Sequence, residues 1–419
     1  MAAADNAELP DTGSIAIDRH PHLHGRHVTN AVEFRDVDIF FARDAGRAGA
    51  VLLSKAQQLL DDGRNRAEIL ESTGVVVGVA GANLAVRSGE ISVLMGLSGS
   101  GKSTLLRAAN GLNPVTRGAV RVAHRGQVVD VATCSPQTLR TLRRGHIAMI
   151  FQQFGLLPWR TVRDNVGLGL EIRGEHPTTR RQRIDEKLAL VGLSQWADHP
   201  VSELSGGMQQ RVGLARALAT DAEILLMDEP FSALDPLIRT KLQGELLSLQ
   251  EQMKKTILFV THDLDEALRL GNRISVLEGG RIVQTGSPED IVLRPQGAYV
   301  TEFVQHVNPL SVLRGRMVMT RLEVLREVDQ GIVFGAGERY HARRDMDGRL
   351  TVVTGDQVVE LRERPVDTPL QELIQLQQHS GHPVWMIDGE QIVGVCTPED
   401  VIRALAGARG AVKQAGGAN

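Results

Sequence analysis

The chain has 419 residues, of which 42% are hydrophobic and 23% are charged, a balance typical of a soluble globular protein with two or three domains. Its 47 Lys and Arg residues and 50 Asp and Glu residues give a net charge of -3, so no basic surplus indicates nucleic acid or an anionic membrane as a partner. Cys134 and Cys396 are too few for a disulfide framework or a cysteine-based metal site, which favours a reducing compartment.

The first 30 residues are rich in Ala, Asp, Gly, Pro and His without an apolar period, which predicts a mobile tail. Its histidines lack the pattern of partners that a metal site needs, so a solvated tail is the preferred interpretation of His20, His22, His24 and His27. The polar start predicts no secretory signal, and no window approaches the ~20 apolar residues of a membrane span.

Residues 31–312 are predicted to form one α/β domain. Strands are expected at residues 32–41, 75–86 and 91–96, with an inserted helix at about 48–72 that carries Leu52, Leu53 and Leu60 on one face. Beyond residue 96, apolar strands alternate with helical stretches, which is typical of a parallel sheet wound with helices. A helical subdomain is expected at about 153–212.

The segment GLSGSGKST at residues 96–104 matches the phosphate-binding loop pattern, and it follows an apolar strand and opens a helix. Glycines let backbone N–H groups close around phosphate oxygens, Lys102 reaches the β and γ phosphates, and Ser103 is a magnesium ligand. This loop alone leaves kinases, GTPases, helicases and transport ATPases open.

Two further strands end in polar groups suited to phosphoryl chemistry. The strand ILLM ends in Asp228, near the expected magnesium, and Glu229, which is suited to polarise a water for in-line attack. His262 closes the strand LFVTHD, from which it can reach the γ phosphate. The alternative, an acidic strand end without function, is disfavoured because Pro230 and the turn SALD follow.

The segment LSGGMQQR at residues 204–211 is a second helix start suited to binding an anion. With this segment, the sequence resembles the ATP-binding subunits of ABC transporters, since LSGGMQQR matches their signature and Gln152 matches their glutamine loop. The order of phosphate loop, glutamine, signature, Asp-Glu, SALD and histidine also matches, and the resemblance covers residues 31–310. It implies a P-loop (RecA-like) ABC ATPase domain with a helical subdomain.

The resemblance further implies a head-to-tail homodimer in which each ATP lies between the phosphate loop of one copy and the signature of the other. Under it, Asp235 communicates across the dimer, and the catalytic residues are Glu229, His262, Gln152 and Lys102. The magnesium ligands are Ser103, Gln152 and Asp228. The ATP-binding residues are Gly96, Ser98, Gly99, Ser100, Gly101, Lys102, Ser103, Thr104, Ser205, Gly206 and Gly207.

Two contacts are less defined by the sequence. The family's adenine-stacking aromatic would fall near residues 73–75, where none is present, so Phe40 or Phe41 is the substitute, and each is equally suited to the core. The family's membrane subunit would dock where Trp159 lies in LLPWR, although a large apolar residue is also commonly buried.

Residues 313–419 are predicted to form a smaller α+β domain. Its segment 366–405, with Thr397 and Asp400 opening a helix, resembles one CBS motif, whereas the preceding segment has no clear copy, so the first repeat is degenerate or absent. Both a regulatory role and a bland role as a cap or dimerisation module remain open.

The inserted segment, the loop GLSGSGKST and the CBS-like tail together resemble quaternary-amine importers, most closely the choline branch. The resemblance implies an ATPase that drives uptake of choline or glycine betaine through separate permease chains, with an indirect substrate-binding protein, at the cytoplasmic face of the inner membrane. One alternative is a soluble ABC-type ATPase acting on nucleic acid or ribosomes, and another is an ATP-gated regulatory module. The complete catalytic set and the absence of tandem cassettes or a basic patch disfavour both.

Overall fold

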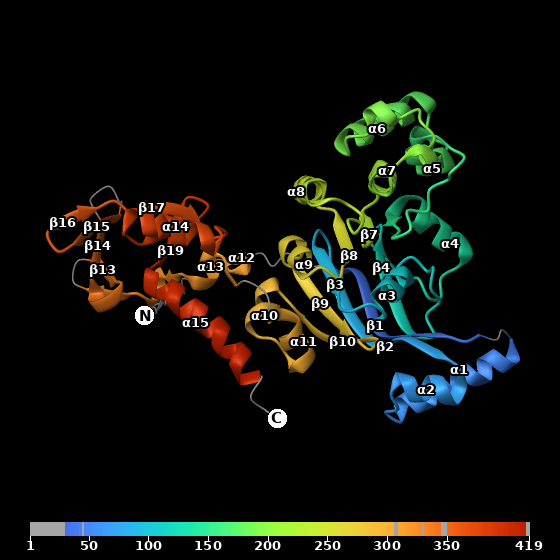
Figure 1. The fold of residues 1–419 in the computed structure, drawn as a ribbon, viewed down its shortest axis with the longest axis horizontal. Helices are drawn as coiled ribbons and strands as arrows, with labels where there is room; N and C mark the ends of the chain where they lie inside the picture. The colour runs from blue at the N-terminus through green and yellow to red at the C-terminus, as the bar shows by residue number, and fades with distance from the viewer. Residues whose placement is uncertain (1–29, 44–45, 306–308, 329–330, 345–349, 416–419) are drawn as a thin grey trace, which may run out of the picture.

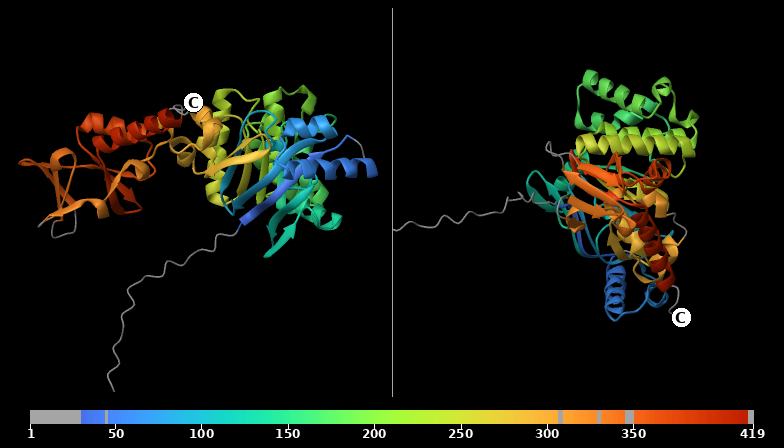
Figure 2. Two further views of the ribbon diagram at one scale, coloured as in Figure 1. Left: turned by 90° about the horizontal axis from the view of Figure 1, so that it is seen from below. Right: turned by 90° about the vertical axis from the view of Figure 1, so that its left-hand side faces the viewer.

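The computed structural model describes residues 30–43, 46–305, 309–328, 331–344 and 350–415 (Figure 1). The tail predicted for the first residues, with its four histidines, lies outside these ranges. A larger body built from residues 30–305 stands beside a smaller body built from the C-terminal residues, as the two views of Figure 2 also show. No helix within the described ranges combines the length and apolar composition needed to cross a bilayer.

A sheet with the order β10-β9-β3-β8-β7-β6 forms the centre of the larger body. Its strands are β3 (Ile91–Met95), β6 (Ile147–Ile150), β7 (Ile224–Asp228), β8 (Thr256–Val260), β9 (Arg273–Glu278) and β10 (Arg281–Gly286). All neighbours run parallel except β10, which pairs antiparallel with β9. Every residue of β3, β7 and β8 is buried, because such a sheet is covered on both faces. The predicted α/β fold class is confirmed.

The two faces of this sheet contribute to separate cores. Leu225 and Met227 pack with the helices of one face, whereas Leu226 packs against the second sheet on the other. That second sheet is antiparallel, with the order β2-β1-β4-β5. Its strands are β1 (Asn30–Phe41), β2 (Val76–Arg87), β4 (Arg117–His124) and β5 (Gln127–Asp130).

Two helices, α1 (Arg47–Asp61) and α2 (Arg66–Thr73), are inserted between β1 and β2. They form a hairpin at the end of the larger body opposite the helical subdomain (Figures 1 and 2). Phe40, Ala56 and Ile69 share the small apolar core beneath it. Asn65 begins α2 with a reciprocal capping box to Glu68, which fixes where the second helix starts.

The helical subdomain extends from the sheet at the top of Figure 1. Besides α1 and α2, the described helices of the larger body are α3 (Lys102–Ala108), α4 (Pro136–Thr141), α5 (Val162–Arg173), α6 (Pro177–Leu190), α7 (Gly206–Ala219), α8 (Pro236–Met253), α9 (Leu264–Leu270), α10 (Pro288–Leu293) and α11 (Gly297–Val304). Short 3-10 helices lie at Ser194–Trp196 and Val201–Glu203, and a turn of π-helix lies at Leu142–His146. Thr161 caps the start of α5, and Gly174 ends it in a left-handed conformation.

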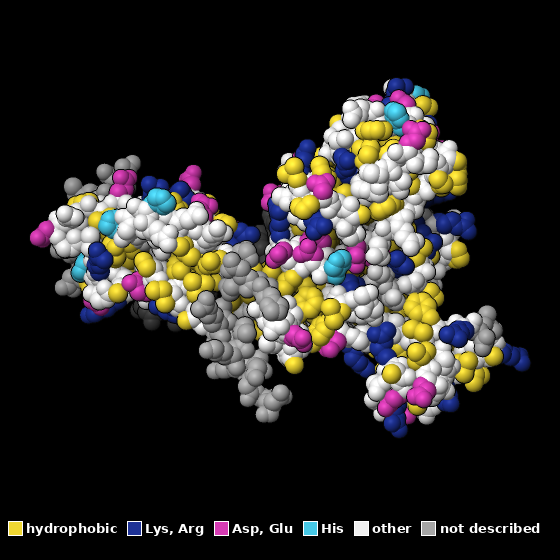
Figure 3. Space-filling model, viewed as in Figure 1, with side chains coloured by type: hydrophobic (Ala, Val, Ile, Leu, Met, Phe, Trp, Pro, Cys, Tyr) yellow, Lys and Arg dark blue, Asp and Glu magenta, His cyan; other side chains and the backbone are white. Residues whose placement is uncertain are grey.

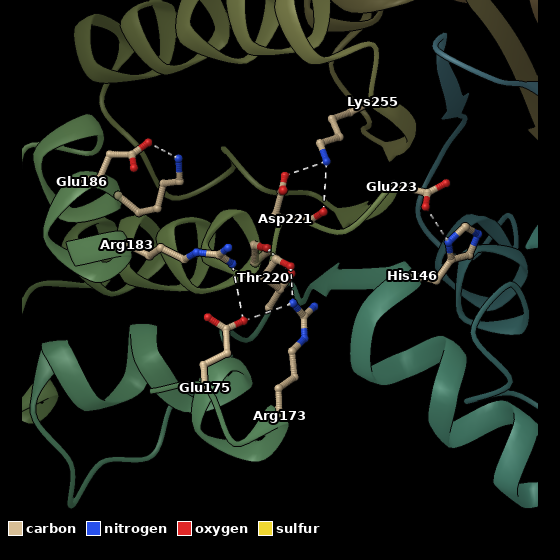
Figure 4. A network of polar contacts seen from close by, with 11 residues as sticks. His146, Arg173, Glu175, Arg183, Glu186, Thr220, Asp221, Glu223 and Lys255 are labelled. Carbon is tan, nitrogen blue, oxygen red and sulfur yellow. Dashed lines mark hydrogen bonds and ion pairs between the residues drawn. The ribbon is translucent and has the colours of Figure 1, made fainter. Parts of the chain in front are cut away.

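A polar network joins this subdomain to the turn that precedes β7 (Figure 4). Arg173 at the end of α5 donates to the Thr220 carbonyl at 2.6 Å, and Glu175 lies between Arg173 and Arg183 at 3.8 and 3.4 Å. Asp221 in the same turn pairs with Lys255 at 2.7 Å. Because the turn leads into β7, these contacts help to position the strand that ends at Asp228.

The C-terminal body contains two sheets, with the orders β11-β19-β18-β17 and β12-β13-β14-β15-β16. Its strands are β11 (Thr320–Arg321), β12 (Arg326–Val328), β13 (Gly331–Phe334), β14 (Tyr340–Arg344), β15 (Leu350–Thr354), β16 (Gln357–Val359), β17 (Arg362–Pro365), β18 (Val384–Asp388) and β19 (Gln391–Cys396). Its helices are α12 (Pro309–Val312), α13 (Gly315–Val318), α14 (Leu370–Ser380) and α15 (Pro398–Ala415), with 3-10 segments at Leu322–Val324 and Ala336–Glu338. The sheet β12-β13-β14-β15-β16 is an antiparallel meander. The ring centroid of its Phe334 lies 5.2 Å from the ring centroid of Trp385 in β18.

Candidate functional site

The phosphate loop lies between β3 and α3, at the carboxyl edge of the central sheet. Gly96 has a φ of 143°, and a Cβ there would lie 2.2 Å from the Leu277 carbonyl oxygen. Gly101 has a φ of 103°, and a Cβ there would lie 2.5 Å from the Gly78 carbonyl oxygen. Only glycine fits both positions, for conformational and steric reasons. The tight turn exposes residues 97–99 while its flanks stay packed against the sheet.

Lys102 at the start of α3 turns back into this loop. Its Nζ donates to the carbonyls of Gly96 at 2.8 Å and Leu97 at 2.9 Å. Burial lowers the pKa of Lys102, while the nearby carboxylates of Glu229 and Asp228 act in the opposite direction. A buried ammonium group whose hydrogen-bond partners, within the described part of the chain, are loop carbonyls is suited to bind an anion that enters the loop.

Asp228 ends β7 directly below the loop and is fully buried. The Ser103 hydroxyl donates to its Oδ1 at 2.6 Å, and Arg107 Nη2 donates to its Oδ2 at 2.9 Å. A hydroxyl and a carboxylate oxygen held together are ligands that magnesium prefers, so these two side chains fit that ion. Within the described residues, no group of three or more His, Cys, Asp or Glu side chains is arranged to hold a metal by itself.

Glu229 follows Asp228 and lies between two groups from other elements. Its Oε2 is 3.2 Å from Nδ1 of His262 and 3.4 Å from the Gln152 amide nitrogen. Its backbone is left-handed, with φ of 49°, and its N–H donates to the Val260 carbonyl at 3.0 Å. The structure thus brings Gln152, Glu229 and His262 together at the sheet edge, as the sequence predicts for neighbouring strand ends.

The signature residues lie elsewhere on the chain surface. Ser205 caps α7 by accepting from the Met208 N–H at 3.4 Å, and Ser205 and Gly206 are exposed. Among the described residues, no hydrogen bond or ion pair joins Ser205, Gly206 or Gly207 to the phosphate loop. Asp235 caps α8, accepting from Ile238 N–H at 3.0 Å. These positions do not complete the phosphate loop of their own chain.

Arg107 and Gln210 contact this site and are absent from the sequence-based set. Arg107 follows Ser103 by four positions, so helical spacing alone puts both on one face of α3 and would have revealed it. The Gln210 amide donates to the Glu229 carbonyl at 3.2 Å and accepts from Ala233 N–H at 3.2 Å, which supports the unusual backbone of Glu229. Gln210 lies within LSGGMQQR, but no local signal indicates its contact with Glu229, because its partners belong to another element.

The two candidate adenine contacts differ in burial. Phe40 is 4% exposed and belongs to the core under the α1–α2 hairpin, whereas Phe41 is 38% exposed. The Phe41 ring flanks Gly78, because a Cβ there would lie 2.8 Å from the ring and 3.1 Å from the Thr104 methyl group. Of the two candidates, Phe41 is therefore the one whose exposed ring lies beside Thr104 at the end of the phosphate loop.

The comparisons agree with this geometry. Residues 79–232 match the family model described as ABC transporter. The chain is 41% identical over 377 residues to the glycine betaine/carnitine transport ATP-binding protein of Listeria monocytogenes, covering 84% of this chain and 94% of the relative. The chain belongs to the ABC transporter family of ATP-binding proteins.

A second relative of this ABC ATPase is the glycine betaine/proline betaine transport system ATP-binding protein of Escherichia coli, 40% identical over 377 residues, with 84% of this chain and 93% of the relative covered. Among solved structures, the dimeric structure of MJ0796, a bacterial ABC transporter cassette, is similar with a TM-score of 0.52 and 30% identity. That match covers 61% of this chain and 98% of the cassette. The predicted ABC family and ATPase class are confirmed.

Proposed function

We propose that this chain is the ATPase subunit of an importer for a quaternary amine, choline or glycine betaine, which separate permease chains carry across the membrane. The observation that carries the proposal is the meeting of Ser103, Asp228 and Glu229 beside the phosphate loop, in an ABC ATPase related along most of its length to betaine-transport proteins. Sequence resemblance alone supports choline, whereas glycine betaine also appears in the names of both relatives.

In the proposed reaction, backbone N–H groups of residues 96–104 and the Lys102 ammonium bind the ATP phosphates. The attacking water forms a bond to the γ phosphorus while the bond from that phosphorus to the bridging oxygen breaks and ADP leaves. Glu229 accepts the proton of this water as the general base. His262 stabilises the γ phosphate, and Gln152 contributes its amide beside the same carboxylate. The distances of 3.2 and 3.4 Å to Glu229 support these roles.

Ser103, Asp228 and Gln152 are the proposed ligands of magnesium. Bound there, the ion would neutralise charge on the phosphates. Arg107 holds the second carboxylate oxygen of Asp228, so the first stays oriented toward Ser103.

The exposed signature supports a homodimer. Ser205, Gly206 and Gly207 do not contact their own phosphate loop, so a second copy is the proposed source of the signature that completes each ATP site. Asp235 begins α8 next to this surface and is the proposed contact between the two sites. The similarity to a cassette whose structure is dimeric supports the same arrangement.

A permease partner is supported by the segment that follows Gln152. Trp159 is 77% exposed, an unusual state for a large apolar side chain, whereas Leu156 packs against the main core. We therefore infer a docking surface at Trp159 and a peripheral position at the cytoplasmic face of the inner membrane. A substrate-binding protein would act on the permease, without contact to this chain.

No observation favours the alternative of an ATPase acting on nucleic acid or ribosomes. On the face drawn in Figure 3, Lys and Arg side chains alternate with Asp and Glu side chains. On this face, such mixed charge gives no continuous basic surface for a phosphate backbone.

The C-terminal body is the proposed site of regulation, with residues 366–405 as a CBS-like motif. Thr397 and Asp400 begin α15 as a pair, with the Thr397 hydroxyl donating to Asp400 Oδ2 at 2.9 Å and Thr320 donating to Oδ1 at 2.9 Å. The meander β12–β16 stands where a first motif copy would precede it. If transport responds to salt and internal ligands equally with and without residues 315–419, only a cap or dimerisation role would remain for this body.

The proposed function is tested by measuring ATP hydrolysis of this subunit assembled with its permease in lipid. The binding protein is loaded in turn with choline, glycine betaine, proline betaine or an amino acid. We expect stimulation by a quaternary amine. Stimulation only by a chemically unrelated solute would leave an ABC importer and remove the quaternary-amine assignment.

A further inference from the structure

The inserted α1–α2 hairpin carries one side chain to the phosphate loop. Arg66, in the first turn of α2, donates from Nη1 to the carbonyl of Gly99 at 3.3 Å. Gly99 is at the exposed tip of the loop, with a φ of 77° and open space where a side chain would begin. The hairpin is thus in direct contact with the predicted ATP-binding loop.

At the start of α2, the nearest carboxylate in the sequence has partners other than Arg66. The local carboxylate, Glu68, is used twice: it accepts from the Asn65 N–H at 3.1 Å and lies 4.0 Å from Arg64. Among the described residues, no Asp or Glu side chain forms an ion pair with Arg66. Its guanidinium has five N–H donors, and the Gly99 carbonyl occupies only one of them.

An ion-pair network and an apolar core hold the hairpin against the β2-β1-β4-β5 sheet. Arg117 of β4 donates to both oxygens of Asp61 at 2.8 Å and to buried Asp38 at 2.6 Å, which ties the end of α1 to the second sheet. Ile69 of α2 is fully buried in the core under the hairpin. Arg66 therefore extends from a rigid element, which favours a preorganised contact.

Arg66 is half-buried, and this burial lowers the pKa of its guanidinium. The group remains charged at neutral pH, since arginine does not lose its proton in proteins. Partial burial of an unpaired cation is unfavourable unless an anion accompanies it. The anion expected beside residues 96–104 is a nucleotide phosphate.

We propose that Arg66 binds the phosphates of ATP from outside the phosphate loop, so that the inserted hairpin is part of the nucleotide-binding site. This inference rests on the proposed function and extends it, because the ATP-binding residues proposed above come from the loop, the signature and the strand ends, and none comes from the hairpin. The unused donors of Arg66 form charge-assisted hydrogen bonds to phosphate oxygens, while the bond to Gly99 orients the guanidinium plane.

The test uses the full chain carrying Glu229→Gln, so that ATP is not consumed during equilibrium binding. ATP affinity is measured in this background for Arg66→Ala and Arg66→Lys, with Arg64→Ala as the matched control, since Arg64 is exposed and faces Glu68. We expect Arg66→Ala to weaken ATP binding about tenfold, as for loss of a hydrogen bond between charged groups. Arg66→Lys should restore most of the affinity, and Arg64→Ala should leave it within about twofold.

Adenosine, which has no phosphates, separates a phosphate contact from a general change in the hairpin. Its affinity should be the same with and without Arg66, whereas a structural defect would weaken adenosine and ATP together. Unchanged ATP affinity in Arg66→Ala would overturn the inference, even if ATP-dependent dimerisation were lost, because Arg66 would then contact the second copy. Failure of the parent chain to bind ATP would instead refute the proposed function.

Discussion

Glu229 Oε2 lies 3.2 Å from Nδ1 of His262, although the two residues follow different strands and are separated by 32 intervening positions along the sequence. The adjacent pairing of β7 with β8 explains the approach, because parallel strands present their carboxyl ends at one edge. Both side chains thus face the region beside the phosphate loop, where an attacking water would be activated.

Glu229→Gln should reduce ATP hydrolysis about a thousandfold, in the range expected for loss of a general base. ATP binding should persist, because phosphate contacts by residues 96–104 are untouched, so an ATP-bound dimer should accumulate. Steady-state phosphate release and size-exclusion chromatography with ATP measure the two effects. Glu223→Gln, at the opposite end of β7, is the control and should hydrolyse ATP normally. Equal turnover in Glu229→Gln and the parent chain would remove Glu229 from the mechanism.

Phe41→Ala should weaken ATP binding by about tenfold, because stacking of a base on an aromatic ring contributes about 1–3 kcal/mol. Phe41→Tyr should retain the affinity. Phe40→Ala should instead lower the free energy of unfolding by about 3 kcal/mol, since that ring is buried in the core. Nucleotide titration and chemical denaturation distinguish the two variants. If Phe41→Ala binds ATP normally, the adenine contact must lie elsewhere.

Trp159→Ala should leave ATP hydrolysis by the isolated chain within about twofold and weaken association with the permease at least about tenfold, as for a buried interface aromatic. Its side chain is 77% exposed, so truncation removes little packing within the chain. Affinity for the permease in detergent provides the measurement. Val128→Ala, at an exposed position of β5, is the control. Normal association of Trp159→Ala would refute the docking surface.

Arg117→Ala should lower the free energy of unfolding by about 1–3 kcal/mol, because it leaves the fully buried carboxylate of Asp38 without its charged partner. Asp38 would keep only the Gly81 N–H at 2.6 Å. Asp61→Ala removes the exposed half of the same network and should have a much smaller effect. Urea unfolding of both variants tests the ranking. Equal destabilisation would mean that the surface pair, and not Asp38, determines the stability here.

Much of the geometry of the candidate ATP site follows from sequence, because its motifs are short, local and ordered. Gly96 and Gly101 have backbone requirements that only glycine meets, and Asp228 and Glu229 end a strand whose apolar residues mark it as central. The C-terminal body was less predictable. The strands of its meander are three to five residues long, and they are fixed by packing against Trp385 more than by local periodicity.

The sequence by itself determined the class of chemistry, because the motifs at residues 96–104, 204–211 and 228–229 are short local patterns. Each supplies the backbone or side-chain groups that phosphate chemistry requires. Only the tertiary structure decided which distant groups meet. Gln210 beneath Glu229 and Arg66 on Gly99 depend on how separate elements dock. Such contacts arise from strand pairing and the burial of apolar faces, which no local pattern specifies.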